Sequence, residues 1–288
     1  MNIDEFLATE SNKWLGRTQT VHDDITAFPI TALTGTLDRE EPPAQRGTPV
    51  PPLWHWLYFL PVYRPGQLRQ DGHGQGGEFM PPIPLPRRVW AGSKFIWNPD
   101  NPLRAGDRAT RISRIESITG KDGSSGKLVF VKVVHEFHNE SGLTLTNEHL
   151  SAFREAAKPG KAKSEPARAE KDAPWHRELV PDPVLLFRYS ALMFNSHRIH
   201  YDHPYAIDIE AYPAILVQGP LISTLLADLL RRKMPDAGLR TFELKALRPS
   251  FVGRTMHLRG SPSGSNIRLW ASDDEGYVTM TATAQIDS

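Results

Sequence analysis

The sequence predicts an α+β fold in which one unit, a long helix wrapped by an antiparallel sheet, occurs twice. Two stretches, 107–153 and 254–286, alternate apolar and polar residues and are interrupted by turns rich in glycine, asparagine and aspartate. This pattern is typical of antiparallel strands in a meander. A strongly apolar helix at 219–234 precedes the second meander. Two such units in one chain are the outline of a double hotdog fold.

The first unit is the less regular of the two. Its strands are expected at 107–118, 127–137 and 143–153. The segment 23–38 is a weaker helix candidate, which Pro29 is expected to interrupt. The many prolines between 42 and 86 favour long irregular loops.

The second unit contains the clearest helix of the chain. Its strands are expected at 254–260, 267–272 and 277–286. The apolar residues that share one helical face are Leu221, Ile222, Leu225, Leu226, Leu229 and Leu230. Pro220 suits the first helical position, and basic residues at 231–233 complement the helix dipole at the other end. Both meanders also follow a proline and a glycine four residues apart, which suggests a duplicated unit.

A polar segment separates the two units. Residues 158–171 contain no large apolar side chain and are typical of a solvated linker. We therefore expect an N-terminal hotdog domain at 1–157, a linker at 158–178 and a C-terminal hotdog domain at 179–288.

Composition excludes several classes of protein. A net charge of +1 over 288 residues argues against nucleic-acid and membrane partners. The absence of cysteine excludes disulfide frameworks and thiol catalysis. No apolar run approaches a membrane span, and the acidic N-terminal residues do not resemble a signal peptide. We expect a cytoplasmic protein, which forms a homodimer.

The residues that carry chemistry are concentrated at 187–206. Its polar positions are Asn195, His197, Arg198, His200, Asp202 and His203, and apolar residues flank them on both sides. An apolar entry into dense titratable groups is typical of a small-molecule active site. The histidines are spaced three residues apart, whereas two zinc-binding histidines on a helix are usually four apart, and the sequence does not constrain a carboxylate to lie beside them. This spacing argues against a metal site. Residues 72–77, GHGQGG, formally match a dinucleotide loop, but no strand precedes them and prolines follow, so a loop over the substrate cleft is expected.

The segment at 195–206 resembles the signature of the MaoC-like dehydratases, the R-specific enoyl-thioester hydratases with hotdog folds. That signature is roughly Asp-x-Asn-Pro-hydrophobic-His, followed by a short run to Tyr-Ala. The corresponding residues here are Asn195, His197, Arg198, Ile199, His200, Tyr205 and Ala206. The whole chain is more similar still to one branch, the double hotdog hydratases of branched C5-dicarboxylyl-CoA thioesters. The stretches WHWLYFLP, PPIPLPRRVWAGS, FRYSAL-x-FN-x-HRIHYD and VQGP carry this similarity.

The resemblance implies a hydro-lyase that forms citramalyl-CoA. That branch includes 3-methylfumaryl-CoA (mesaconyl-CoA) hydratase and itaconyl-CoA hydratase, and the sequence does not choose between these substrates. CoA would be part of the substrate, and no cofactor or metal is expected. A 3-hydroxyacyl-thioester dehydratase of fatty acid metabolism remains the alternative enzyme. A hotdog protein that binds acyl-CoA without catalysis is the alternative outside the enzymes.

The resemblance implies the catalytic roles of the MaoC-like dehydratases for this chain, with one change. Asn195 stands where the signature has aspartate, and an amide cannot take a proton from water. Asn195 is therefore expected to hold the water while His200 acts alone as general base. Gly219, at the start of the apolar helix, is expected to donate its N–H to the thioester oxyanion. The structural alternatives are that Asn195 caps a turn, that His200 packs in the core with its hydrogen bonds satisfied, and that Gly219 only begins a core helix.

The remaining candidates concern substrate binding. Arg198 replaces the proline of the signature, and a guanidinium binds a carboxylate through two hydrogen bonds. It is the first candidate for the free carboxylate of the substrate, Arg188 is the second, and a surface ion pair is the alternative for each. Further substrate contacts are expected from Tyr201, His197 and Gln218. The first unit lacks an Asn/His segment, so it is expected to form the other wall of the pocket, where WHWLYFLP lines the acyl site or packs in the core.

Overall fold

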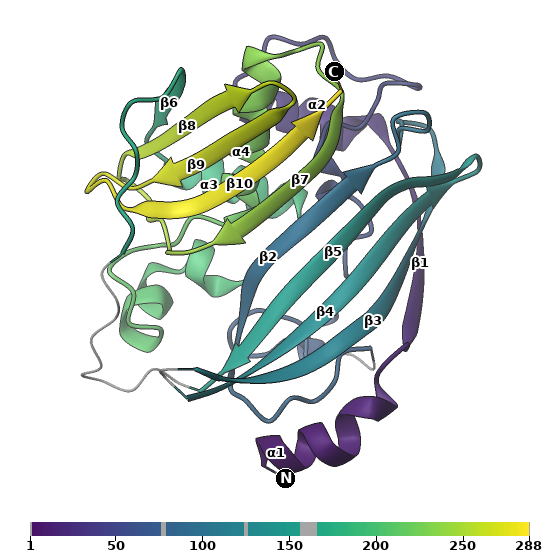
Figure 1. Cartoon of the computed structure of the whole chain (residues 1–288), viewed down its shortest axis with the longest axis vertical. Coiled ribbons are helices and arrows are strands. Elements are labelled where there is room, and N and C mark those ends of the chain that lie inside the picture. The colour runs from purple at the N-terminus through teal and green to yellow at the C-terminus, as the bar shows by residue number, and fades with distance from the viewer. Residues whose placement is uncertain (1, 76–78, 124–125, 156–165, 288) are drawn as a thin grey trace.

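A ten-stranded antiparallel sheet dominates the computed structural model, which describes residues 2–75, 79–123, 126–155 and 166–287 (Figure 1). Its strands run in the order β1-β3-β4-β5-β2-β7-β10-β9-β8-β6. They are β1 (Thr18–Asp24), β2 (Arg87–Trp97), β3 (Arg108–Gly123), β4 (Gly126–Asn139), β5 (Gly142–Arg154), β6 (Trp175–Leu179), β7 (Leu239–Ala246), β8 (Met256–Ser263), β9 (Asn266–Ser272) and β10 (Val278–Ile286). The helices are α1 (Ile3–Glu5), α2 (Ala27–Thr36), α3 (Pro183–Leu192) and α4 (Gly219–Lys233).

The sheet repeats one topology on either side of its centre. From β2 outward the order is β2-β5-β4-β3-β1, and from β7 outward it is β7-β10-β9-β8-β6. The corresponding strands come in the same chain order in both halves. Strands β2 and β7 pair at the centre, where Phe95 lies opposite Phe242 and both side chains are fully buried. The predicted double hotdog fold is confirmed.

Most predicted elements of the meanders and the second helix are present. The predicted strands correspond to β3, β4, β5, β8, β9 and β10, and the predicted helix corresponds to α4. Strands β1, β2, β6 and β7 were not predicted. The first helix is shorter than expected, because residues 23 and 24 belong to β1. Pro29 does not interrupt it, since it lies in the first turn, where no intrahelical N–H bond is lost.

The predicted linker needs correction at its C-terminal end. Residues 158–165 lie outside the described part of the chain, but Arg168 forms a bridge with Tyr277 and Trp175 begins β6. Strand β6 pairs with β8, where Trp175 lies opposite Gly260. Residues 175–178 are therefore strand, because the aromatic ring of Trp175 gives this segment apolar surface to bury.

All three longer helices lie on one face of the sheet (Figure 1). Helix α4 has 15 residues and is buried throughout its middle, whereas α2 has only 10 residues. At 1.5 Å per residue, α2 is roughly 7 Å shorter. Part of the inner face of the N-terminal half is thus not covered by α2, and residues 54–59, which include a short 3₁₀ helix at Trp54–Leu57, pack there instead.

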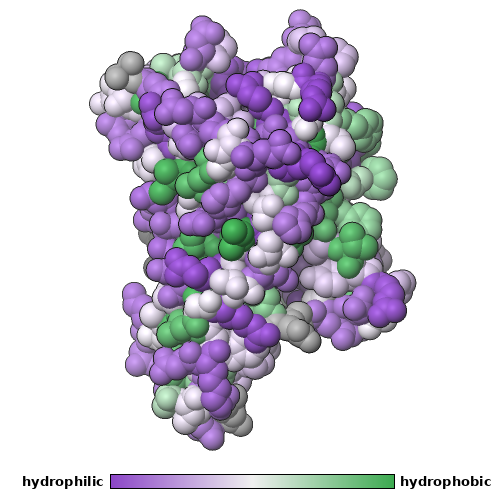
Figure 2. Space-filling view, turned by 90° about the vertical axis from the view of Figure 1, so that its right-hand side faces the viewer, coloured by the Kyte–Doolittle hydropathy of each residue, from purple (hydrophilic) through white to green (hydrophobic). Residues whose placement is uncertain are grey.

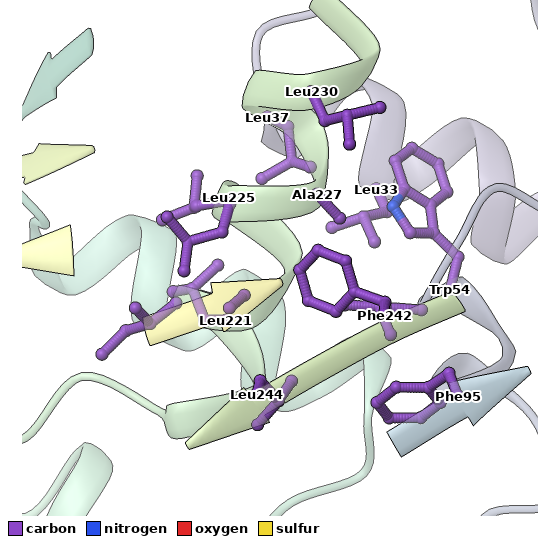
Figure 3. Close-up of a cluster of buried hydrophobic side chains, with 14 of the residues drawn as sticks. Leu33, Leu37, Trp54, Phe95, Leu221, Leu225, Ala227, Leu230, Phe242 and Leu244 are labelled. Carbon is purple, nitrogen blue, oxygen red and sulfur yellow. The ribbon is translucent and has the colours of Figure 1, made fainter. Parts of the chain in front are cut away.

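One apolar core joins the two halves. Leucines of α4 meet Phe242 of β7, Phe95 of β2 and Trp54 of the first half (Figure 3). On the face in Figure 2, apolar side chains occur in small groups between polar ones. Within the described residues, no helix is long and apolar enough to cross a membrane. The expected homodimer stays a prediction.

Candidate active site

The inner face of the N-terminal half of the sheet is polar where no helix covers it. His135 of β4 shares its face with the buried Val133 and Phe137, and His149 of β5 shares its face with the buried Asn147 and Ser151. His135 Nδ1 lies 2.7 Å from Ser113 Oγ, and His149 Nδ1 lies 3.5 Å from Ser93 Oγ. Hydrogen-bonding groups on the inside of a hotdog sheet are suited to a polar ligand rather than to a fatty chain.

A cavity of about 260 Å³ lies between residues of the N-terminal half, which include Arg111 and Phe137 of the sheet, and the 193–196 segment. Residues from both halves of the chain line it, among them His55, Trp56, His73, Arg111 and Asn195. The predicted WHWLYFLP stretch contributes to both the cavity and the core, because Trp54 is buried while its neighbour Trp56 lines the cavity. This arrangement agrees with the expectation that the first half forms one wall of the substrate pocket.

Two residues that line the cavity have left-handed backbone conformations. Phe59 has a φ of 56° and Phe194 has a φ of 48°, in the region that favours glycine. Such conformations cost roughly 1–3 kcal/mol each and persist where the surrounding structure fixes them. Phe194 directly precedes Asn195, so the strain lies at the entry to the polar segment.

Asn195 is fixed by its own segment and lines the cavity. Its backbone N–H donates to the Ser190 carbonyl at 2.8 Å, and its Oδ1 accepts from the His197 N–H at 3.1 Å. The Asn195 Nδ2 has no protein hydrogen-bond partner among the described residues. Asn195 can therefore donate one amide hydrogen to a water or substrate oxygen.

His200 has a defined tautomer. Its Nδ1 lies 2.9 Å from the Leu216 carbonyl oxygen, and a carbonyl can only accept, so the Nδ1 carries the hydrogen. The Nε2 of the neutral ring then keeps its lone pair. Burial lowers the pKa of His200 to about 4. At neutral pH the ring is therefore an uncharged base with one free nitrogen.

A loop of the N-terminal half packs directly on this segment. The rings of His73 and His197 lie 3.9 Å apart between centroids, and His197 lies 5.4 Å from His200. Ser196 Oγ donates to the Gly72 carbonyl at 2.6 Å. Gly72 has a φ of +86°, and a Cβ there would lie 1.9 Å from the backbone carbonyl oxygen of Ser196. Only glycine permits this approach, which holds the two halves of the site together.

Arg198 is already paired within the protein. Its Nε and one terminal nitrogen donate to Asp202 at 2.9 and 2.7 Å, and the other donates to the Gln70 carbonyl at 3.1 Å. Its guanidinium carbon also lies 4.1 Å from the centre of the Tyr205 ring. These contacts hold Arg198 in the 198–202 turn and match the alternative of an ion pair, while its expected contact with a substrate carboxylate stays a prediction.

Helix α4 begins beside the site, and an aromatic ring covers its first residue. A Cβ on Gly219 would lie 3.1 Å from the Trp90 ring, so a larger residue there would require the ring to shift by a few tenths of an ångström. Trp90 in turn contacts Trp56, which lines the cavity. Gly219 itself does not line that cavity. His200 does not line it either. Its ring is hydrogen-bonded to the carbonyl of Leu216, which lies three residues before Gly219 in the chain.

The other predicted substrate contacts lie elsewhere. Gln218 is fully buried, and its Nε2 donates to the Leu186 carbonyl and to Ser190 Oγ, so it joins α3 to the start of α4. Tyr201 is 53% exposed and donates to the Ser196 carbonyl. Arg188 is exposed on α3, beside Gly35 of α2. None of these three lines the cavity.

Among the described residues, two groups have the geometry to hold a metal ion. They are Asp71, His73 and His197 at the site, and His176, Glu178 and His257 at the β6–β8 edge. In the first group the His73 backbone N–H donates to Asp71 Oδ1 at 2.9 Å, and His73 Nδ1 lies 3.4 Å from Asp71 Oδ2. Sequence spacing did not suggest it, because Asp71 and His73 are far from His197 along the chain.

The buried histidines predict a marked acid sensitivity. Burial lowers the pKa of His55, His135, His149 and His197 to about 3. Between about pH 6.5 and pH 4 the unfolded chain binds protons that the folded chain does not, so stability rises with pH. We expect full stability above pH 6.5 and a steep loss toward pH 4. Urea midpoints at pH 7.5, 5.5 and 4.5 measure this loss. An unchanged midpoint would contradict the neutral state of these rings.

The sequence pointed to the segments that contain His55 and His73 as candidate parts of the pocket but singled out neither histidine, and it gave no role to Arg111. Arg111 carried a usable signal, since it occupies an inward position of β3 between Ala109 and Ser113, both of which are buried. A charged residue at an inward strand position is rare without a ligand or partner. His73 carried no comparable signal.

Residues 53–252 match the family model described as hydroxyacyl-thioester dehydratase type 2. The chain is 41% identical over 279 residues to mesaconyl-C(4)-CoA hydratase of Chloroflexus aurantiacus, covering 95% of this chain and 96% of that protein. A mitochondrial hydroxyacyl-thioester dehydratase type 2 of Schizosaccharomyces pombe is 38% identical over 93 residues, covering 32% and 30% of the two chains.

Solved structures share the fold at low identity. HtdX of Mycobacterium tuberculosis superposes with a TM-score of 0.65 at 18% identity, covering 94% of this chain and all of that one. A MaoC-like dehydratase of Phytophthora capsici superposes with a TM-score of 0.68 at 16% identity, covering 100% and 99%. The chain therefore belongs to the hydroxyacyl-thioester dehydratase type 2 family, and it is an enzyme of the hydro-lyase class with a MaoC-like double hotdog fold.

Proposed function

We propose that this hydro-lyase adds water to a branched, unsaturated C5-dicarboxylyl-CoA thioester and forms citramalyl-CoA. The coarser activity, hydration or dehydration of CoA thioesters, follows from the family and from the relative in Chloroflexus aurantiacus. That relative is a mesaconyl-C(4)-CoA hydratase and aligns over nearly its whole length. The finer assignment to a C5-dicarboxylyl substrate rests on this similarity and on the polar cavity.

The observation that carries the proposal is the hydrogen bond from His200 Nδ1 to the Leu216 carbonyl. It leaves Nε2 as the free base, as hydration of an enoyl thioester requires. The same bond ties the histidine to the backbone that leads into α4. Since the first N–H groups of a helix have no intrahelical partner, this end can donate to a thioester oxygen.

The proposed reaction uses His200 for both proton transfers. His200 Nε2 takes a proton from water, the oxygen bonds to the β-carbon, and the π electrons move onto the thioester carbonyl. The Gly219 N–H stabilises the resulting enolate oxygen. With a mesaconyl-type substrate the imidazolium then returns its proton to the α-carbon, which restores the carbonyl and completes the addition of one water. An itaconyl-type substrate would instead take that proton at its terminal methylene. A histidine with a pKa of about 4 gives up its proton readily once protonated, which favours the return step over the first proton transfer.

Asn195 orients the water but takes no proton. Its Oδ1 already accepts the His197 N–H, and its Nδ2 is available to a water or substrate oxygen. The scheme requires no metal and no cofactor beyond the CoA of the substrate.

The alternative is a dehydratase of long-chain 3-hydroxyacyl thioesters. The cavity favours a short polar acyl group, because His55, His73 and Arg111 line it together with aromatic rings. A long apolar tunnel would have no use for these side chains.

A substrate panel tests the proposal. We expect mesaconyl-C4-CoA or itaconyl-CoA to be hydrated with a kcat/KM at least about tenfold above that of a long-chain enoyl-CoA, a difference of roughly 1.4 kcal/mol. Loss of the enoyl absorbance and chromatography of the product measure the rates. A preference for the long-chain substrate would support the fatty acyl alternative instead.

A further inference from the structure

The cavity contains a cation that the proposed chemistry does not use. Arg111 of β3 lines it together with Asn195. One terminal nitrogen of Arg111 donates to the Phe59 carbonyl over a long 3.3 Å contact. The Arg111 Nε is buried and has no hydrogen-bond partner. A buried donor of this kind costs free energy unless something binds it.

No carboxylate neutralises Arg111 within the described residues. The acid whose charge acts on it is Asp23, on the neighbouring strand β1, where Val21 pairs with Arg111. Asp23 Oδ2 instead accepts the Phe59 N–H at 2.6 Å, and it forms no ion pair with Arg111 within 4.0 Å. Arg198 differs in this respect, since Asp202 already accepts two of its hydrogen bonds.

A second unpartnered donor or acceptor lies in the same wall. His55 is almost completely buried, lines the cavity, and its Nε2 has no hydrogen-bond partner. Burial, together with the charge of Arg111, lowers the pKa of His55 to about 3. The ring is therefore neutral, and it adds a polar contact beside the guanidinium without adding charge.

The geometry points to a carboxylate subsite in which Arg111, with His55 beside it, binds the free carboxylate of the acyl group. This inference rests on the proposed function and makes it specific: the β-carbon that receives hydroxide would carry the carboxylate held by Arg111. Since a guanidinium donates two parallel hydrogen bonds to a carboxylate, the interaction also orients the double bond. Arg111 is then a specificity residue, and Arg198 is a positioning residue.

Binding of two saturated analogues tests the subsite without turnover. In 2-methylsuccinyl-C4-CoA the β-carbon carries a carboxylate, and in isovaleryl-CoA it carries a methyl group in the same place. We expect the wild-type protein to bind the first at least about 30-fold more tightly, and Arg111→Gln to bring this ratio close to one. Isothermal titration calorimetry measures both dissociation constants.

Two variants serve as controls. Arg108→Gln removes an exposed arginine of the same strand, and Arg198→Gln removes the positioning residue; both are expected to keep the wild-type binding ratio, even where Arg198→Gln weakens both ligands. Arg111→Lys retains the charge and is expected to give an intermediate ratio, which covers the case in which Arg111→Gln does not fold.

The outcomes separate the subsite from the proposed function. A wild-type ratio near one, or an Arg111→Gln ratio equal to that of wild type, would overturn the subsite even if mesaconyl-C4-CoA is hydrated. If Arg198→Gln alone lowered the binding ratio, Arg198 rather than Arg111 would bind the carboxylate, and the proposed subsite would be overturned as well. Failure to hydrate any enoyl-CoA, with a wild-type ratio that depends on Arg111, would leave a carboxylate-binding site and overturn the hydratase assignment.

Discussion

Replacing His200 with alanine is expected to lower kcat for hydration by about 10²- to 10⁴-fold, the usual contribution of a positioned general base. His200 is the group in the 195–202 segment whose tautomer leaves a free Nε2 through a bond to a backbone carbonyl. Asn195 cannot replace it as a base. Steady-state hydration of an enoyl-CoA, with the folded state checked by circular dichroism, measures the effect.

His203→Ala is the matched control. His203 lies three residues further along the same segment, but its side chain is exposed. We expect this variant to keep kcat within about twofold of wild type, since surface substitutions rarely disturb a fold. Equal losses in both variants would mean that the segment is only sensitive to substitution, and a fully active His200→Ala would exclude His200 as the base.

Replacing Asp228 with alanine is expected to lower the free energy of unfolding by about 3–5 kcal/mol, as for other buried ion pairs that lose one partner. The Asp228 side chain, on α4, has no exposure. It accepts hydrogen bonds from Arg39, Arg177 and Arg232 at 2.5, 2.7 and 2.7 Å. Removing the carboxylate would leave three arginines facing one another where the two halves of the chain meet.

Urea denaturation measures this change against a matched control. Asp236 follows α4, is exposed, and forms no ion pair with the described residues, so Asp236→Ala is expected to change stability by less than about 0.5 kcal/mol. A loss below about 1 kcal/mol in Asp228→Ala would show that the arginine cluster does not depend on its carboxylate.

The sequence predicted the parts of the fold that have regular patterns. Helix α4 was clear because its leucines repeat at helical spacing and Pro220 starts it. The meander strands were clear because one face of each is buried. Strands β2 and β7 were not, since they meet at the centre of the sheet, and their pairing depends on contacts between residues about 150 positions apart.

Only part of the site could be predicted from the sequence, because the rest also depends on contacts between residues far apart in the chain. The segment from Asn195 to His200 is local, so its composition and its resemblance to known dehydratases both pointed to it. The other wall depends on tertiary structure: Arg111 comes from β3, and His73 comes from a loop that docks on Ser196. Arg198 was expected to bind the carboxylate because it replaces the proline of the signature, with an ion pair as the alternative, and the structure shows such a pair with Asp202.

The most direct measurement is hydration of mesaconyl-C4-CoA in heavy-oxygen water, followed by mass spectrometry of the thioester product. We expect one labelled oxygen, bonded to the carbon that bears the methyl and carboxylate groups, and formation of that product at least about 10²-fold more slowly with His200→Ala. Recovery of unreacted mesaconyl-C4-CoA from the wild-type protein, or equal rates for wild type and His200→Ala, would contradict it.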